Sequence, residues 1–173
     1  QTISGQIGIA IDNAQLLEKL SELSKTDELT GLYNRRTFFE MLGAEISHSN
    51  RHSHPFSLAM LDLDSFKSFN DRFGHTSGDA ALRKFGNAVK SALRKTDAAF
   101  RYGGDEFTVI LPSTEAKKSK HVIEHIRKKW LQTQYKHYPD AEISIKFSAG
   151  IAQYPDDTET IDGLIFLADT ALL

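Results

Sequence analysis

The 173-residue sequence predicts an α+β sandwich of the ferredoxin-like type, in which helices flank a mainly antiparallel central sheet. Three observations support this prediction. The patterns of apolar and polar residues follow the order strand, helices, strand, strand, helix, strand and helix. A Gly-Gly pair separates the two adjacent strands, as in a hairpin. The composition, with 40% hydrophobic and 25% charged residues, is that of one globular domain with a hydrophobic core.

Composition also excludes several classes of protein. The absence of cysteine rules out disulfides, cysteine-based zinc sites and thiol catalysis. A formal charge of -2 argues against electrostatic binding of nucleic acid. Because no apolar stretch is long enough to cross a bilayer and no signal peptide opens the chain, we expect a cytoplasmic protein without membrane insertion in this segment. The sequence starts with Gln1 and stops at Leu173 inside an amphipathic run, so we expect a piece of a longer protein.

Apolar residues at helical spacing predict a long N-terminal helix between residues 3 and 24. They fit a heptad seam, and Asn13 falls on the same stripe, where a single asparagine often sets the register of two parallel helices. The segment therefore either pairs with a second copy as a coiled coil or packs on its own domain as one amphipathic helix. The seam consists of Ile9, Leu16, Leu20 and Leu23.

Capping and turn-forming residues then separate the first two helices. They are Thr26, Asp27, Gly31 and Asn34. The second helix is predicted at residues 35–49, with a loop at 48–55, and its buried face comprises Phe38, Phe39, Leu42 and Ile46.

The remaining elements follow from the same periodicities. A glycine pair, Gly103 and Gly104, stands at the tip of the predicted hairpin, where we expect positive φ angles. In order, the predicted elements are a buried strand at 56–64, a short helix at 66–73, a turn at 74–78, a helix at 79–95, strands at 98–102 and 107–111, a helix at 115–132, one or two strands within 141–154, and a helix at 159–173.

Four carboxylates are expected to meet at one edge of the sheet. Asp62 and Asp64 end the first central strand, and Asp105 and Glu106 occupy the tip of the hairpin beside it. Such a cluster is unfavourable unless cations neutralise it, and oxygen ligands without cysteine favour Mg²⁺ or Mn²⁺. This arrangement is typical of two-metal nucleotidyl transfer. Taken singly, each acid also has a structural explanation, as a cap for the helix that begins near Ser65 or as an exposed turn residue.

Polar residues that follow the first two acids are candidates for holding a nucleotide. The chain lacks the glycine-rich phosphate loop that ends in Lys-Ser or Lys-Thr, but Lys67 can contact a phosphate as a point charge. Asn70, His75 and Asp79 follow at the next turn and helix start, and an Asn and Asp pair can hydrogen-bond a purine edge. The structural alternatives are a surface lysine and a helix-start acid that the dipole favours.

Together these residues resemble the GGDEF domain of diguanylate cyclases. The resemblance runs from residue 26 to the end and includes the signature Arg101-Tyr102-Gly103-Gly104-Asp105-Glu106-Phe107. The other matching stretches are Asp27-Glu28-Leu29-Thr30-Gly31-Leu32-Tyr33-Asn34-Arg35-Arg36, Asp62-Leu63-Asp64-Ser65-Phe66-Lys67, Asn70-Asp71, Phe73-Gly74-His75, Gly78-Asp79 and Ala168-Asp169-Thr170-Ala171-Leu172. The resemblance implies a nucleotidyl cyclase palm-type fold at 26–173, and residues 1–25 resemble the last, signal-carrying helix of GAF sensor domains.

The resemblance also implies a reaction, in which two GTP condense to cyclic di-GMP with release of two pyrophosphates. Each domain holds one GTP, so the reaction implies a two-fold homodimer. Two Mg²⁺ or Mn²⁺ ions per site are implied, and the residues that resemble their ligands are Asp62, Leu63 through its carbonyl, Asp105 and Glu106. Asp105 resembles the residue that acts as the base for the 3′-OH. Asp79 resembles the residue at this position in family members that make cyclic di-GMP only, rather than cyclic GMP-AMP. The residues that resemble catalytic and substrate contacts are Asp105, Glu106, Lys67, Asn70, His75, Asp79, Gly103 and Gly104.

Two further features bear on regulation. Arg94 and Asp97 resemble the family's inhibitory Arg-x-x-Asp site, at which the product binds, and Asp97 lies six residues before Gly103. The alternative is a basic residue at a helix end, which the dipole favours; His125 lies near where some members place a second arginine. In the last helix Leu173 takes the place of the family's tyrosine, and the phosphate-holding Lys and Arg that follow it in the family are missing; either they were removed, or they are disordered, or this protein differs from the family. Two other functions stay open: a non-catalytic receptor for GTP or cyclic di-GMP that signals through its N-terminal helix, and a cyclase with relaxed base choice.

Overall fold

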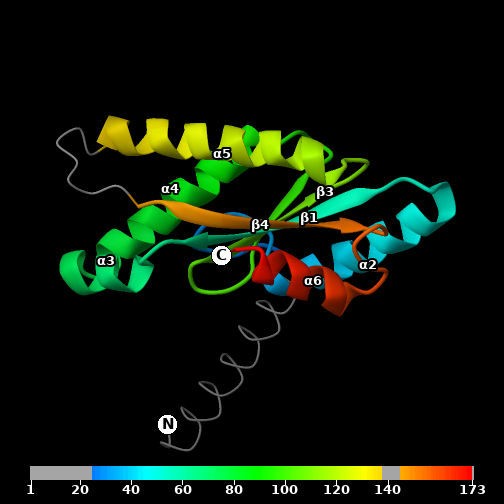
Figure 1. Cartoon of the computed structure of the whole chain (residues 1–173). Helices are drawn as coiled ribbons and strands as arrows, with labels where there is room; N and C mark the ends of the chain where they lie inside the picture. Colours follow the sequence, from blue (N-terminus) through cyan, green and yellow to red (C-terminus); the bar gives the residue numbers. More distant parts are fainter. Residues whose placement is uncertain (1–24, 138–144, 173) are drawn as a thin grey trace, which may run out of the picture.

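The computed structural model describes residues 25–137 and 145–172. Within these ranges four strands form one sheet with the order β2-β3-β1-β4, and each neighbouring pair is antiparallel (Figure 1). The strands are β1 (Phe56–Leu63), β2 (Ala98–Arg101), β3 (Glu106–Leu111) and β4 (Phe147–Tyr154). This strand order, with helices between β1 and β2 and between β3 and β4, confirms the predicted ferredoxin-like fold.

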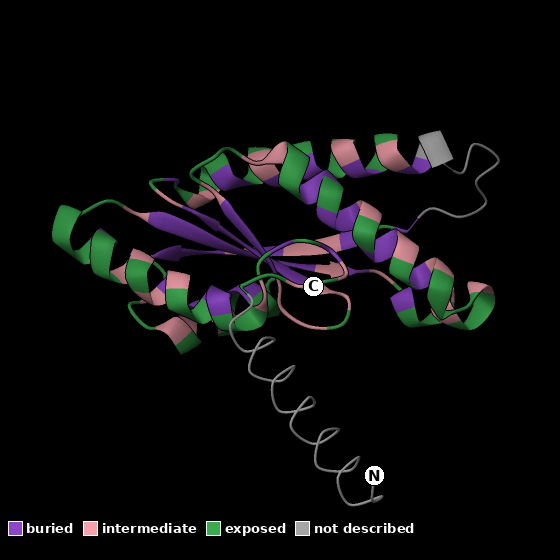
Figure 2. Ribbon diagram, turned by 180° about the vertical axis from the view of Figure 1, so that it is seen from behind, coloured by how far each residue is buried: buried purple, intermediate pink, exposed green. Residues whose placement is uncertain are grey.

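Helices cover both faces of the sheet (Figure 1). They are α2 (Arg35–His52), α3 (Phe66–Phe73), α4 (His75–Ala92), α5 (Ala116–His137) and α6 (Ile161–Thr170). Phe85 of α4 and Trp130 of α5 belong to the core cluster on one face, whereas Phe38 of α2 and Leu164 of α6 belong to the cluster on the other face. Figure 2 shows this division, with buried residues along the strands and along the inner sides of the helices.

β1 lies between β3 and β4, and its side chains enter both core clusters. Leu61 and Leu63 pack with α4 and α5, and Leu58 and Met60 pack with α2 and α6. Asp62 is the one residue of β1 that is not buried. It is also the one charged residue of this strand, and an acid at the end of a buried strand marks this end of the sheet as a candidate site.

The segment between residues 25 and 34 differs in detail from the prediction. Asp27 does not cap a helix; its carboxylate accepts hydrogen bonds from the backbone N and the Oγ1 of Thr30, at 2.8 and 2.7 Å. Asn34 caps α2 by accepting from the backbone N of Thr37 at 3.0 Å. Gly31 has the expected turn role, with a φ of 67°.

α2 and α5 are longer than the periodicity predicted, α4 is shifted toward the N-terminus and ends at Ala92 rather than at residue 95, and α6 is shorter, since it spans Ile161–Thr170 rather than 159–173. α2 continues into the predicted loop and ends at His52. Its last three residues are polar and face solvent as a helical turn, and Ser53, which has a left-handed conformation, terminates the helix. α4 begins at His75 rather than at Asp79, because Gly74, with a φ of 80°, ends α3 and starts α4 without an intervening turn. α5 reaches His137. The prediction that Phe39 is buried was wrong, since it is 38% exposed.

Some predictions fall on residues 1–24, 138–144 and 173, which lie outside the described residues. They include the N-terminal helix with its seam, the start of the 141–154 strand region, and Leu173. In the part of the chain that the structure describes, no helix combines the length and the apolar character needed to cross a membrane.

Candidate active site

The sheet brings the predicted acids together at one end. Asp62 at the end of β1 lies directly opposite Glu106, the first residue of β3. Asp105 precedes Glu106, and its carbonyl accepts a hydrogen bond from the backbone N of Leu63 at 3.3 Å. The convergence predicted from sequence therefore occurs, because β1 and β3 are antiparallel neighbours and the end of one meets the start of the other.

Electrostatic repulsion marks Asp62 as the centre of this cluster. Burial raises the pKa of its carboxyl, and the charges of Asp105, Glu106, Asp64 and Asp169 raise it further, from 3.8 to about 6. Burial and like charges both disfavour the ionised form of an acid. A carboxylate in such surroundings is stabilised by a proton or by a cation.

Asp64 belongs to the site rather than to a helix cap. Its Oδ1 accepts a hydrogen bond from the Oγ of Ser148 on β4 at 2.8 Å. The residue that precedes α3 is Ser65, and α3 has no side-chain cap. Ser65 has a φ of 57°, a left-handed conformation that is uncommon outside glycine. The structural explanation of Asp64 as a cap is thereby excluded.

The two glycines of the hairpin differ in their surroundings, since an added Cβ would contact Glu106 at Gly103 but would meet no atom within 4 Å at Gly104. The expectation of positive φ at Gly103 and Gly104 was wrong, because the positive-φ glycines in the described residues are Gly31 and Gly74. An added Cβ at Gly103 would meet the carboxylate of Glu106, which is the end of a flexible side chain and would have to turn away. The loop closes tightly, since the backbone N atoms of Tyr102 and Gly103 both donate to the Glu106 carbonyl, at 2.9 and 3.2 Å.

Asp169 on α6 is a member of the acid cluster that the sequence did not assign. Its charge contributes to the raised pKa of Asp62. The helix approaches β4 closely at Gly150, where a Cβ would collide with the carbonyl of Ala168. Ala168 and Asp169 belong to one of the stretches that resemble the family, so the sequence contained a signal for this residue. Nothing in the sequence, however, placed the end of α6 beside β1.

The donor set suits a hard cation by its chemistry. Its side-chain oxygens are carboxylate oxygens, and positive charge would remove the repulsion around Asp62. Among residues 25–137 and 145–172, however, no three His, Asp or Glu side chains are arranged to hold a metal ion. The Mg²⁺ or Mn²⁺ ligand set therefore stays a prediction.

The residues predicted to hold the nucleotide lie on α3 and α4. Lys67, His75 and Asp79 are exposed, and Asn70 is half-buried. The Oδ1 of Asn70 is buried without a hydrogen-bond partner, and it lies against Gly78, where a Cβ would collide with it. An unpaired amide oxygen is unfavourable unless water or a ligand completes its hydrogen bonding. The roles of these four residues stay predictions.

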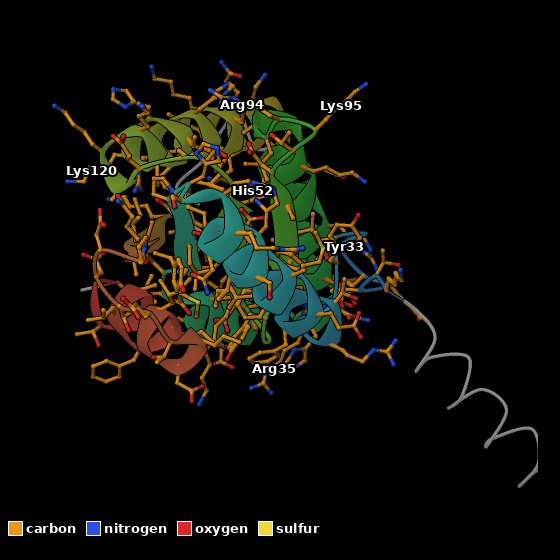
Figure 3. All side chains as sticks on the ribbon, turned by 90° about the vertical axis from the view of Figure 1, so that its right-hand side faces the viewer. Tyr33, Arg35, His52, Arg94, Lys95 and Lys120 are labelled. Atoms are coloured by element: carbon orange, nitrogen blue, oxygen red, sulfur yellow. The ribbon has the colours of Figure 1, made fainter. Side chains whose placement is uncertain are left out.

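Arg94 and Asp97 form a compact turn after α4. The backbone N of Arg94 donates to the Asp97 Oδ2 at 2.9 Å, and the backbone N of Asp97 donates to the Arg94 carbonyl at 3.1 Å. Both line a hollow of about 330 Å³ together with His125 of α5, as well as a second hollow of about 400 Å³ that includes Tyr33. Figure 3 shows Arg94 and Lys95 at the end of α4, beside α5.

Comparison with known proteins identifies the family. The sequence model of the family described as "Diguanylate cyclase, GGDEF domain" matches residues 24–173, and the chain therefore belongs to this family. It is 35% identical to diguanylate cyclase A of Treponema denticola over 175 residues, which are 99% of this chain and 46% of that protein. It is 36% identical to diguanylate cyclase DosC of Escherichia coli K12 over 161 residues, which are 91% of this chain and 35% of that protein. The chain thus spans less than half the length of these relatives.

Solved structures support the same family. The GGDEF domain of DgcB from Caulobacter crescentus, crystallised in complex with c-di-GMP, has a TM-score of 0.75 and 30% identity, covering 86% of this chain and 88% of that one. The diguanylate cyclase SiaD from Pseudomonas aeruginosa, in complex with its activator SiaC, has a TM-score of 0.76 and 35% identity, covering 98% of this chain and 64% of that one.

Proposed function

We propose that this domain is a diguanylate cyclase that condenses two GTP into cyclic di-GMP and releases two pyrophosphates. The observation that carries the proposal is the pair Asp62 and Glu106 on adjacent strands, with Asp105 beside them and a raised pKa at Asp62. The relatives named diguanylate cyclase support the reaction. GTP as substrate favours a location in the bacterial cytoplasm.

The acids have two tasks in this proposal. Two Mg²⁺ or Mn²⁺ ions per site, when bound, would neutralise the triphosphate and stabilise the charge that develops at the α-phosphate. Asp62, Asp105, Glu106 and the carbonyl of Leu63 would hold them. Asp105 would also accept the proton of the attacking 3′-OH, as the resemblance to the family implies; its place beside Asp62 supports this role.

The nucleotide would lie between the hairpin and the α3–α4 pair. Lys67 would contact a phosphate, and the small Gly103 and Gly104 would let the phosphates approach the backbone. Asn70 would use its unpaired Oδ1 toward the guanine. Asp79 would accept from the guanine N1 and N2 hydrogens, and His75 would complete the nucleotide contacts.

One domain holds one of the two substrates, so we propose a two-fold homodimer in which each 3′-OH attacks the α-phosphate held by the partner. Residues 1–25 would control this encounter as a signalling helix joined to the catalytic domain at 26–173. The product would inhibit at Arg94 and Asp97, and the hollow that they share with His125 supports a ligand site there.

Incubation of the protein with GTP, ATP and Mg²⁺, followed by mass spectrometry of the products, tests the proposal. We expect cyclic di-GMP from GTP alone and none from Asp105→Ala, with both proteins folded by circular dichroism. Glu159→Gln is the matched control, because this exposed acid lies near Tyr154, at the opposite end of β4 from the acid cluster.

The other possible results of this experiment distinguish the alternative functions and test the role of Asp105. Tight binding of GTP or cyclic di-GMP without synthesis would favour the receptor. A mixed product from GTP and ATP would indicate relaxed base choice. Synthesis that survives in Asp105→Ala would refute the role given to Asp105.

A further inference from the structure

Arg101 connects the signature loop to the segment that precedes α2. Its Nη1 lies 3.3 and 3.1 Å from the two carboxylate oxygens of Asp27. Its Nε and Nη2 donate to the carbonyl of Gly104, at 3.2 and 2.8 Å. Gly104 directly precedes Asp105, so one guanidinium joins Asp27 to the backbone beside the acid cluster.

Both partners of this ion pair are shielded from water. The side chain of Arg101 is 18% exposed and that of Asp27 is 22% exposed. By contrast, the pairs Arg36–Glu40, Lys118–Glu115 and Arg127–Glu124 join close neighbours along one helix or its start, with at least 44% of each side chain exposed. A shielded, multidentate arginine holds its partners more firmly than a surface pair does.

Asp27 is itself held in place. Its carboxylate receives two hydrogen bonds from Thr30. Burial alone would raise its pKa, but the hydrogen bonds from Thr30 and the charge and hydrogen bonds of Arg101 outweigh burial and lower the pKa below 3.8. Asp27 is therefore a fixed anion, to which Arg101 and the signature loop are anchored.

The backbone of the same segment is attached to β2. The backbone N of Tyr33 donates to the Ala99 carbonyl at 3.1 Å, and the backbone N of Arg101 donates to the Tyr33 carbonyl at 2.8 Å. Both the backbone and the side chain of Arg101 are thus held by residues 25–34. In Figure 3, Tyr33 lies on this segment.

We propose that Asp27 is a positioning residue that acts through Arg101 to hold the Gly104 carbonyl, and with it the Asp105 and Glu106 carboxylates, in the catalytic arrangement. The inference rests on the proposed function. It gives residues 25–34 a second role beyond joining two helices, because any movement of this segment relative to β2 would loosen the loop that carries the acids.

Hydrogen exchange and kinetics of Asp27→Asn, Arg101→Gln and the double variant test this inference. We expect faster exchange at the backbone amides of Tyr102 and Gly103 in each variant, and a fall of about 10- to 100-fold in kcat, since small misplacements of reacting groups have effects of this size. The half-saturating Mn²⁺ concentration, measured by binding without nucleotide, should rise. Because the two residues act as one unit, the double variant should be no worse than the worse single variant.

Ser57→Ala is the matched control for lost stability. It removes a buried hydrogen bond from the Ser57 Oγ to the Thr114 carbonyl, 2.7 Å long, at the end of β1 opposite the acids. This variant should lower the melting temperature while it leaves loop exchange, Mn²⁺ binding and kcat unchanged.

Unchanged loop exchange and Mn²⁺ binding in Asp27→Asn would overturn the inference. A fall in the kcat of the double variant equal to the product of the falls in the two single variants would also overturn it. If the wild type makes no cyclic di-GMP, the proposed function fails while loop exchange and Mn²⁺ binding still decide the positioning role. If Ser57→Ala loses as much activity as Asp27→Asn, the effect of Asp27→Asn arises from lost stability of the domain, and the positioning role is refuted.

Discussion

Asp62→Asn removes the charge at the centre of the acid cluster and keeps the shape of the side chain. Without divalent cations, we expect this variant to be more stable than the wild type at neutral pH. The reason is that the folded protein resists ionisation of Asp62, as its raised pKa indicates, whereas the unfolded chain does not.

The size of the effect follows from the pKa. A rise from 3.8 to about 6 corresponds to at most about 3 kcal/mol in the free energy of unfolding. Because Asp62 is partly exposed, water screens the repulsion, and we expect about 1 to 2 kcal/mol. In a domain of this size that is a difference of roughly 3 to 6 °C in melting temperature.

The pH dependence has a defined direction. Well below pH 3.8, Asp62 is protonated in both states and does not destabilise the wild type; the penalty grows as pH rises from 3.8 to about 6 and is nearly complete about one pH unit higher. The advantage of Asp62→Asn should therefore be nearly full at about pH 7.5 and nearly absent at about pH 3.

Thermal unfolding followed by circular dichroism, with EDTA or with Mg²⁺, measures these differences. Mg²⁺ should raise the melting temperature of the wild type and have less effect on Asp62→Asn, since a ligand that binds only the folded state stabilises it. Glu159→Gln should respond to Mg²⁺ as the wild type does. A variant that is less stable than the wild type in EDTA at neutral pH, or a difference that does not change with pH, would refute the reasoning.

Gly150→Ala should lower the free energy of unfolding by about 1 to 3 kcal/mol in urea denaturation, because the added Cβ must displace the backbone of α6 at Ala168. Gly43→Ala in α2, where no atom lies within 4 Å of an added Cβ, should instead raise it by about 0.5 to 1 kcal/mol; equal losses in both would contradict the close approach at Gly150. Asp97→Ala should weaken inhibition by added cyclic di-GMP at least about tenfold, since hydrogen bonds to charged groups contribute about 1.5 kcal/mol or more. Initial rates with and without added product measure this, and unchanged inhibition would exclude Asp97 from the product site.

Local patterns predicted the elements whose ends carry strong signals. α3 has the predicted bounds, Phe66–Phe73, and β1 ends within one residue of the prediction. The predictions failed where the signal was weak or ambiguous. Polar residues at the end of α2 are compatible with both a loop and an exposed helix turn, and the glycines at 74 and 78 are compatible with both a turn and a helix start.

Sequence by itself determined the order of elements, and the ferredoxin-like fold typical of that order predicted that Asp62 and Glu106 meet on neighbouring antiparallel strands, as they do. Only the tertiary structure decided which further groups join them. Asp169 reaches the cluster through the packing of α6 on Gly150, and Asp27 reaches Arg101 across 74 positions of the chain. Contacts between residues so distant in sequence depend on how whole elements pack, and no local periodicity encodes that packing.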